Sequence, residues 1–114
     1  MPLRWDAHRS ALSSISEAIG RTPLVRLNRV TTHVRPAIYL KGEWFGPSGS
    51  LKDRIYLHMF ERAEARGELK PGMRVLECCT GNAGIACAFI AAVKGYRCTI
   101  VMPPGMSDER KKIM

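Results

Sequence analysis

The spacing of hydrophobic residues divides the chain into short alternating runs followed by longer helical ones. Residues 14–19 predict a short helical turn, which Gly20 closes. Residues 24–30 and 37–44 alternate between apolar and polar positions, a pattern typical of two short strands. Residues 50–66 then change to helical spacing. The apolar stripe of this predicted helix recurs every fourth position, at Leu51, Ile55, Met59 and Ala63.

A strand–helix–strand unit follows in the second half of the chain. Residues 73–78 form a short apolar run, 85–94 an apolar helix that ends at Gly95, and 98–102 a second apolar run. Runs of this kind are typical of parallel strands buried on both faces, joined by a crossover helix. Ser107 then opens a last helix. The pattern predicts an α/β fold with an open parallel sheet.

Composition narrows the class of protein. Hydrophobic residues make up 46% of the chain, which is typical of a globular protein and excludes wholesale disorder. The longest apolar run, 85–93, is too short to span a bilayer, which needs about 20 residues. The net charge of +8 permits binding to nucleic acid or to phosphorylated ligands, but the basic residues are scattered. We therefore expect a generally basic surface and keep a non-catalytic basic binding role as an alternative.

The four cysteines predict reduced thiols rather than a metal site or a disulfide framework. Cys78 and Cys79 are adjacent, and no C-x-x-C pair occurs. Cys87 and Cys98 fall in apolar segments, where cysteine acts as a small hydrophobic residue. Residues 1–14 lack the apolar core of a secretory signal. We expect a cytoplasmic protein with no metal ion.

The segment 46–54, GPSGSLKDR, places Lys52 at the start of a predicted helix, directly after a tight turn. The positive end of the helix dipole disfavours an ammonium group, so we expect the pKa of the Lys52 amine to be lowered. A lysine that becomes a free amine near neutral pH can form a Schiff base. We expect Ser50 to cap the helix, with Asp53 completing a weak capping box.

A second glycine turn, TGNAG at 80–84, lies between a predicted strand and the crossover helix. Such turns present backbone N–H groups to an anion, and open α/β sheets bind ligands at this end of their strands. The side-chain amide of Asn82 is suited to a hydrogen bond with a ligand oxygen. The segment lacks the G-x-G-x-x-G order and a Walker A lysine, so it does not predict a dinucleotide site.

Four segments of the chain occur in the order and spacing of one enzyme family. They are IGRTPLVRL (19–27), PSGSLKDR (47–54), TGNAG (80–84) and MPPGMSDER (102–110). From about residue 14 onward, the chain resembles cysteine synthase and cystathionine β-synthase, which are fold type II pyridoxal-phosphate enzymes. The resemblance implies an α/β fold with a three-layer open parallel sheet, the small-domain part of the tryptophan synthase β-like fold, here truncated.

The resemblance also implies roles for individual residues. Lys52 would form the Schiff base with pyridoxal 5′-phosphate and would remove and return the α-proton of the substrate. Asn82 would hydrogen-bond the 3′-oxygen of the cofactor ring. The loop that grips the substrate carboxylate would consist of Cys79, Thr80, Gly81, Asn82 and Ala83. The implied reaction replaces the acetate of O-acetylserine with sulfide to give cysteine, with the cofactor as electron sink.

Three positions depart from the family pattern and leave the substrate open. Gly46 stands where the family usually has asparagine, and Cys79 and Ala83 replace two hydroxyl residues of the carboxylate loop. Loss of a hydroxyl donor to a charged carboxylate costs about 1.5–3 kcal/mol. A lyase that resembles cystathionine β-synthase or a serine/threonine dehydratase is therefore the alternative within the enzyme class.

We expect the chain to divide into three segments. These are a tail with a short helix (1–23), two strands that pack on a large domain absent from this chain (24–45), and part of a small α/β domain with the cofactor lysine (46–114). The last helix has no cap and the pattern lacks its next strand, so we expect an N-terminal fragment. The resemblance implies that the phosphate-binding loop of the family lies beyond residue 114, so we expect this fragment to be inactive alone. The resemblance implies a small amino-acid substrate, a homodimeric full-length parent, and neither a membrane nor a nucleic acid as partner.

Overall fold

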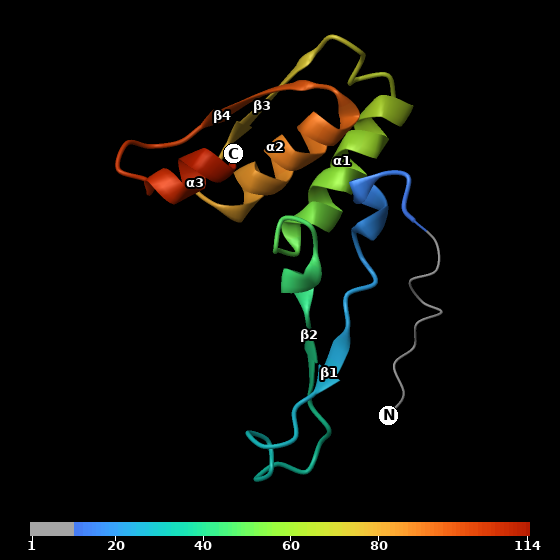
Figure 1. The fold of residues 1–114 in the computed structure, drawn as a ribbon, viewed down its shortest axis with the longest axis vertical. Coiled ribbons are helices and arrows are strands. Elements are labelled where there is room, and N and C mark those ends of the chain that lie inside the picture. Colours follow the sequence, from blue (N-terminus) through green and yellow to red (C-terminus); the bar gives the residue numbers. More distant parts are fainter. Residues whose placement is uncertain (1–10) are drawn as a thin grey trace.

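The computed structural model describes residues 11–114, so the first ten residues of the predicted tail lie outside the described part. The elements follow the predicted order along the chain (Figure 1). They are η2 (Ile15–Ala18), β1 (Leu24–Arg26), β2 (Tyr39–Lys41), η3 (Glu43–Phe45), α1 (Lys52–Ala65), β3 (Arg74–Cys78), α2 (Asn82–Lys94), β4 (Arg97–Val101) and α3 (Asp108–Ile113). Most bounds lie within a few residues of the predicted ones, but β1 and β2 are shorter than expected.

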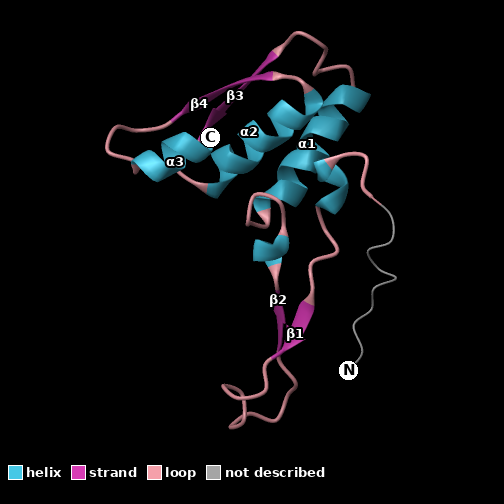
Figure 2. Cartoon of the chain, viewed as in Figure 1, coloured by secondary structure: helices cyan, strands magenta, loops and turns pink. Residues whose placement is uncertain are grey.

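The predicted βαβ unit forms the centre of the molecule. β3 and β4 pair in parallel, with Val75 opposite Cys98 and Glu77 opposite Ile100. The helix α2 lies between this two-stranded sheet and α1, so the helices and the sheet form successive layers (Figures 1 and 2). Because parallel strands need a crossover connection, α2 both joins the strands and covers them. The α/β class and the parallel pairing are confirmed.

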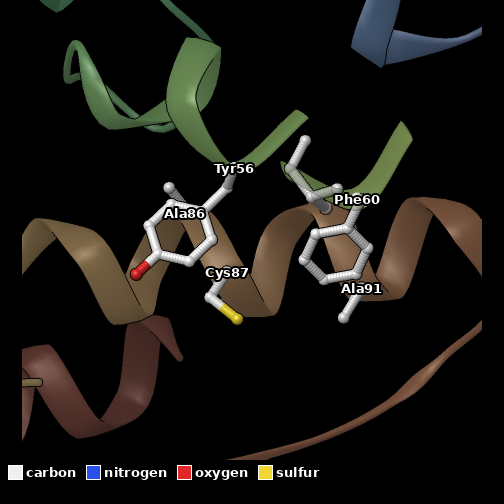
Figure 3. Close-up of a cluster of buried hydrophobic side chains, with 6 residues drawn as sticks. Tyr56, Phe60, Ala86, Cys87 and Ala91 are labelled. Atoms are coloured by element: carbon white, nitrogen blue, oxygen red, sulfur yellow. The ribbon is translucent and has the colours of Figure 1, made fainter. Parts of the chain in front are cut away.

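The core lies between α1 and α2. Tyr56 and Phe60 of α1 are 7% and 5% exposed and lie over a face of α2 that includes Ala86, Cys87 and Ala91 (Figure 3). These three residues are fully buried and small, so they leave room for the two aromatic rings. Ile90 of α2 is fully buried in the same cluster, so the interface between the helices combines two aromatic rings with small and branched apolar side chains.

The apolar stripe predicted for α1 is not its buried face. Leu51, Ile55 and Met59 are 49%, 40% and 52% exposed. The buried face is set by Tyr56 and Phe60, which are also four residues apart but one position further round the helix. Both sets of residues recur every fourth position, so the sequence pattern did not distinguish them. In the structure the aromatic pair occupies the core.

The sheet is covered on one face only in the part of the chain that is described. Val75 and Glu77 of β3 lie on the half-buried face toward the helices, as do Cys98 and Ile100 of β4. On the opposite face Leu76 is 69% exposed. The expected burial on both faces is therefore not found among residues 11–114, because α2 packs on a single side.

Polar side chains link α1 to the other layers. The Tyr56 hydroxyl donates a hydrogen bond of 2.8 Å to Glu77, and burial raises the pKa of Tyr56 well above its usual range. Further along α1, Glu64 accepts hydrogen bonds from Lys94 at 2.7 Å and from the Tyr96 hydroxyl at 2.9 Å. The Lys94 ammonium is the main reason that the pKa of Glu64 is lowered. These contacts fix the register of α1 against the βαβ unit.

The strands β1 and β2 form a separate antiparallel ribbon that extends away from the helices (Figure 1). β2 ends early because the chain turns at the buried Gly42 into η3, where the predicted strand would have continued. At the base of the ribbon, the Thr22 hydroxyl donates to Glu43 at 2.9 Å. Arg54 of α1 donates to both residues at 3.0 Å, so this three-residue network attaches the ribbon to α1.

The packing of α1 generates a matched pair of variants. Phe60→Ala should lower the free energy of unfolding by about 3–5 kcal/mol, because it leaves a cavity in the core. Met59→Ala, one residue away on the exposed stripe, should change it by no more than about 0.5 kcal/mol. Urea denaturation followed by circular dichroism measures both. Equal losses would show that the exposed stripe contributes to the core.

The network at the base of the ribbon generates a pH-dependent prediction. Hydrogen bonds from Arg54 and then Thr22 hold the pKa of Glu43 below its ordinary value of 4.5. The ionised carboxylate therefore adds stability that is complete above that value and is lost as pH falls through the lowered pKa. The denaturation midpoints of the wild type and Glu43→Gln should differ most near neutral pH and converge in acid. A difference that is independent of pH would contradict this assignment.

Candidate active site

The two glycine turns are brought together around one cavity. Lys52 is the first residue of α1, and the 80–84 turn joins β3 to α2. Both face a cavity of about 440 Å³. Its lining residues are Lys52, Cys79, Thr80, Gly81, Asn82, Ala83 and Arg110. The structure therefore gathers every residue that the sequence proposed for the site and adds Arg110.

The turn before Lys52 is held by a buried carboxylate. Asp53 is 1% exposed, and its side chain accepts hydrogen bonds from the Ser48 backbone N–H at 2.9 Å and from the Ser48 hydroxyl. Gly49, with a φ of +75°, lets the chain reverse between these two residues. The effect is to fix the start of α1 and, with it, the point from which the Lys52 side chain extends.

This arrangement differs from the predicted capping box. Leu51 is the capping residue and makes no side-chain cap hydrogen bond. Ser50 is one position further out, where its hydroxyl accepts the Lys52 N–H at 3.2 Å. The Asp53 side chain bonds to Ser48 and not to Ser50, whereas the Asp53 backbone N–H donates to the Ser50 carbonyl at 3.4 Å.

The departure at Gly46 has a local reason in the same turn. A Cβ at this position would lie 2.8 Å from Oδ2 of Asp53, closer than side-chain atoms normally approach. Glycine therefore leaves the space that the buried carboxylate occupies. Its N–H donates to the Glu43 carbonyl at 3.3 Å, which ties the turn to η3.

The loop before α2 is held at both ends by the backbone. The Cys79 N–H donates to the Val101 carbonyl at 3.0 Å, which continues the β3–β4 ladder beyond the strands. At the other end, the N–H groups of Gly84 and Ile85 donate to the Gly81 carbonyl at 3.0 and 3.4 Å. The N–H groups at the first positions of α2 have no acceptor within the helix. They are available to a ligand at the cavity.

The cavity favours anions. Lys52 and Arg110 contribute two positive side chains, and the amino end of α2 adds the positive end of its dipole. None of the lining residues is acidic. A ligand with carboxylate or phosphate groups is therefore the kind of molecule that this site attracts.

The sulfur of Cys79 is packed against the helix. An added Cβ at Gly84 would overlap this sulfur, which shows how closely the thiol lies against the first turn of α2. The nearest acceptor found for the thiol is the Gly81 carbonyl, at 3.9 Å. Cys79 therefore fills space under the loop, and a thiol is in any case a weak hydrogen-bond donor.

The other cysteines lie outside the cavity. Cys87 is buried in the core, and its burial raises the pKa of the thiol to about 12, so it stays protonated. Its sulfur lies 3.9 Å from that of Cys98 on β4. Within residues 11–114 no group of three His, Cys, Asp or Glu side chains is arranged to hold a metal ion.

Sequence reasoning did not select Arg110, although it lies at the end of the 102–110 segment. Its guanidinium Nη1 donates to the Thr80 carbonyl at 2.8 Å. The available signal was topological. Segments that follow two neighbouring parallel strands meet at the same edge of the sheet, so the segment after β4 was bound to lie near the loop after β3.

Comparison with known proteins gives a consistent result. The family model described as pyridoxal-phosphate dependent enzyme matches residues 15–114. Cysteine synthase B of Escherichia coli (strain K12) is 48% identical over 103 residues, which cover 90% of this chain and 34% of that protein. Cystathionine beta-synthase of Apis mellifera is 48% identical over 101 residues, which cover 87% of this chain and 20% of that protein.

The fold agrees with solved structures of the same kind. The crystal structure of cysteine synthase from Entamoeba histolytica matches with a TM-score of 0.87 and 40% identity. The match covers 99% of this chain and 33% of that one. The chain therefore spans about a third of the length of these two cysteine synthases.

The contact between Cys79 and Gly84 generates a double-variant prediction. Alanine in place of helical glycine ordinarily stabilises a helix by about 1 kcal/mol. Gly84→Ala should instead destabilise the chain, because the new methyl group overlaps the Cys79 sulfur. Removal of that sulfur in the Cys79→Ala, Gly84→Ala double variant should restore most of the loss. Urea denaturation of the wild type, both single variants and the double variant measures the coupling, and additive effects would rule out the contact.

Proposed function

The chain belongs to the pyridoxal-phosphate-dependent enzyme family, and from this premise we propose that it carries the cofactor-lysine part of a cysteine synthase-like active site. The proposed reaction replaces the acetate of O-acetylserine with sulfide to give cysteine. The observation that carries the proposal is the single cavity that contains both Lys52 and the 79–83 loop. The family relationship favours this enzymatic role over a non-catalytic basic binding role.

The residues around the cavity fit the chemistry of pyridoxal 5′-phosphate. Lys52 supplies an amine for covalent attachment, and Asn82 supplies an exposed side-chain amide for the ring 3′-oxygen. When bound, the cofactor supplies an electron sink for the electron pair released at the substrate α-carbon. Lys52 would also take up the α-proton of the substrate and return it.

The 79–83 loop is proposed to bind the substrate carboxylate. The N–H groups of Asn82 and Ala83 at the start of α2 provide donors that do not depend on side chains. The Thr80 hydroxyl adds a third donor on the same cavity. Because the Cys79 sulfur is packed under the loop, replacement of a hydroxyl at this position removes a donor without blocking the backbone groups.

A second candidate substrate pair comes from the comparison with cystathionine beta-synthase, which is as similar in sequence as cysteine synthase B. It would combine serine with homocysteine. A threonine dehydratase activity is the third possibility within the family.

Assays of the longest protein that carries this chain should compare O-acetylserine with sulfide, serine with homocysteine, and threonine alone. The highest kcat/KM should be for O-acetylserine with sulfide, and a higher value for either alternative would replace this proposal.

Several finer points remain predictions. The low activity expected of the 114-residue chain alone and the homodimer come from the resemblance, and the cytoplasmic location comes from the prediction that the cysteines are reduced. Of the helices in the described part of the chain, none has the length and apolar character needed to cross a membrane. The amino-acid nature of the substrate is supported by the cysteine synthase relatives.

The assignment of Lys52 can be tested by chemical trapping, which does not require turnover. Pyridoxal 5′-phosphate is added to the 114-residue chain, the imine is reduced with borohydride, and the labelled peptide is mapped by mass spectrometry. We expect the label on Lys52, because its amine lies in the anion-attracting cavity. Lys52→Ala should abolish the label, whereas Lys70→Ala, at an exposed lysine outside the cavity lining, should not. Preferential labelling of another lysine would contradict the site.

A further inference from the structure

The loop that lines the cavity has one weakly held peptide unit. Within the described residues, the only hydrogen bond found to Thr80 is the one from Arg110 to its carbonyl, at 2.8 Å. Cys79 on one side is tied to Val101, and Gly84 on the other to Gly81. The Thr80–Gly81 peptide therefore lies between two anchored points and depends on the Arg110 side chain for its own orientation.

Rotation of this peptide unit would exchange the positions of its donor and its acceptor. Gly81, its second residue, has no Cβ to hinder such a rotation, and nothing lies within 4 Å of the place that a Cβ would take. In a trans peptide the C=O and N–H groups point in opposite directions, so rotation of the unit would turn the Thr80 carbonyl to where the Gly81 N–H had been. A carbonyl dipole aimed at a bound anion would oppose its binding.

We propose that Arg110 is a positioning residue that holds the Thr80 carbonyl away from the ligand and so fixes the direction of the Gly81 N–H. This inference rests on the proposed function, because it assumes that the loop receives the carboxylate of an amino-acid substrate. It assigns α3 a role in the site, since Arg110 lies in α3, thirty positions after Thr80. The guanidinium suits this task because it is planar, always charged, and donates without accepting.

The charge of Arg110 also acts on the ligand directly. Its side chain lines the same cavity as Lys52, so the hydrogen bond to Thr80 retains a cation beside the loop. The neighbouring Lys111 offers a matched comparison. It carries the same charge on the same helix, but it pairs with Asp108 at 3.1 Å and does not line the cavity.

Backbone ¹⁵N relaxation of the 114-residue chain tests the proposal. Arg110→Met removes the hydrogen bond and the charge while it keeps much of the side-chain length. It should lower the order parameter of the Gly81 amide from the rigid range, about 0.85, to below about 0.6, because the peptide loses the contact that holds its carbonyl. Arg110→Lys should restore part of this order, and Lys111→Met should leave the segment 80–83 unchanged.

The denaturation midpoint separates positioning from a general structural role. If Arg110 only stabilises the fold, Arg110→Met should lower the midpoint without a selective loss of order in 80–83. Under the present proposal the midpoint stays near that of the wild type and the loss of order is confined to 80–83. Unchanged order parameters in 80–83, or an equal effect of Lys111→Met, would overturn the proposal.

A second readout keeps this inference distinct from the proposed function. Borohydride trapping of pyridoxal 5′-phosphate at Lys52 in the wild type tests the cofactor site separately from the order of the loop. Normal trapping in the wild type, with the order parameters of 80–83 unchanged by Arg110→Met, would reject the role of Arg110 and leave the cofactor site standing. Failure of trapping at Lys52 in the wild type would instead reject the proposed function, whatever the relaxation data show.

Discussion

The packing of two aromatic rings against a surface of small residues is the contact on which the rest of the structure depends. Tyr56 and Phe60 can lie close to α2 only because Ala86 and Ala91 leave the space for them. This contact sets α1 beside α2, and the turn that precedes each helix then faces the same cavity. The core therefore does more than stabilise the chain, because it determines the separation between Lys52 and the loop across from it.

The sequence was sufficient for the elements of the βαβ unit, because apolar runs of the right length were separated by glycine turns. It also indicated Lys52, at the start of a predicted helix, and Asn82, in the glycine turn that precedes the crossover helix. It did not identify the buried face of α1, because two sets of residues share the same four-residue spacing. Tertiary packing determines that Tyr56 and Phe60, and not Ile55 and Met59, form the buried face. A local sequence pattern contains no information about that packing.

Other features required the folded chain for the same reason. Asp53 was expected to complete a box with Ser50, a choice made on spacing alone. The structure shows that the reversal at Gly49 brings Ser48 closer, so the carboxylate bonds there. Arg110 was likewise not identified from the sequence. Its contact with Thr80 joins two segments that become neighbours only because β3 and β4 pair in parallel.

The sign of the charges around the cavity has a consequence for the chain in the absence of any ligand. Lys52, Arg110 and the amino end of α2 repel one another, and no acidic residue of the lining offsets them. Some folding stability is therefore given up at the place where an anion would later bind, a trade-off common at functional sites. The same repulsion makes the chain sensitive to its medium. Multivalent anions such as phosphate or sulfate should occupy the cavity and act as stabilisers, whereas chloride, which makes no comparable set of hydrogen bonds, should serve mainly to screen it.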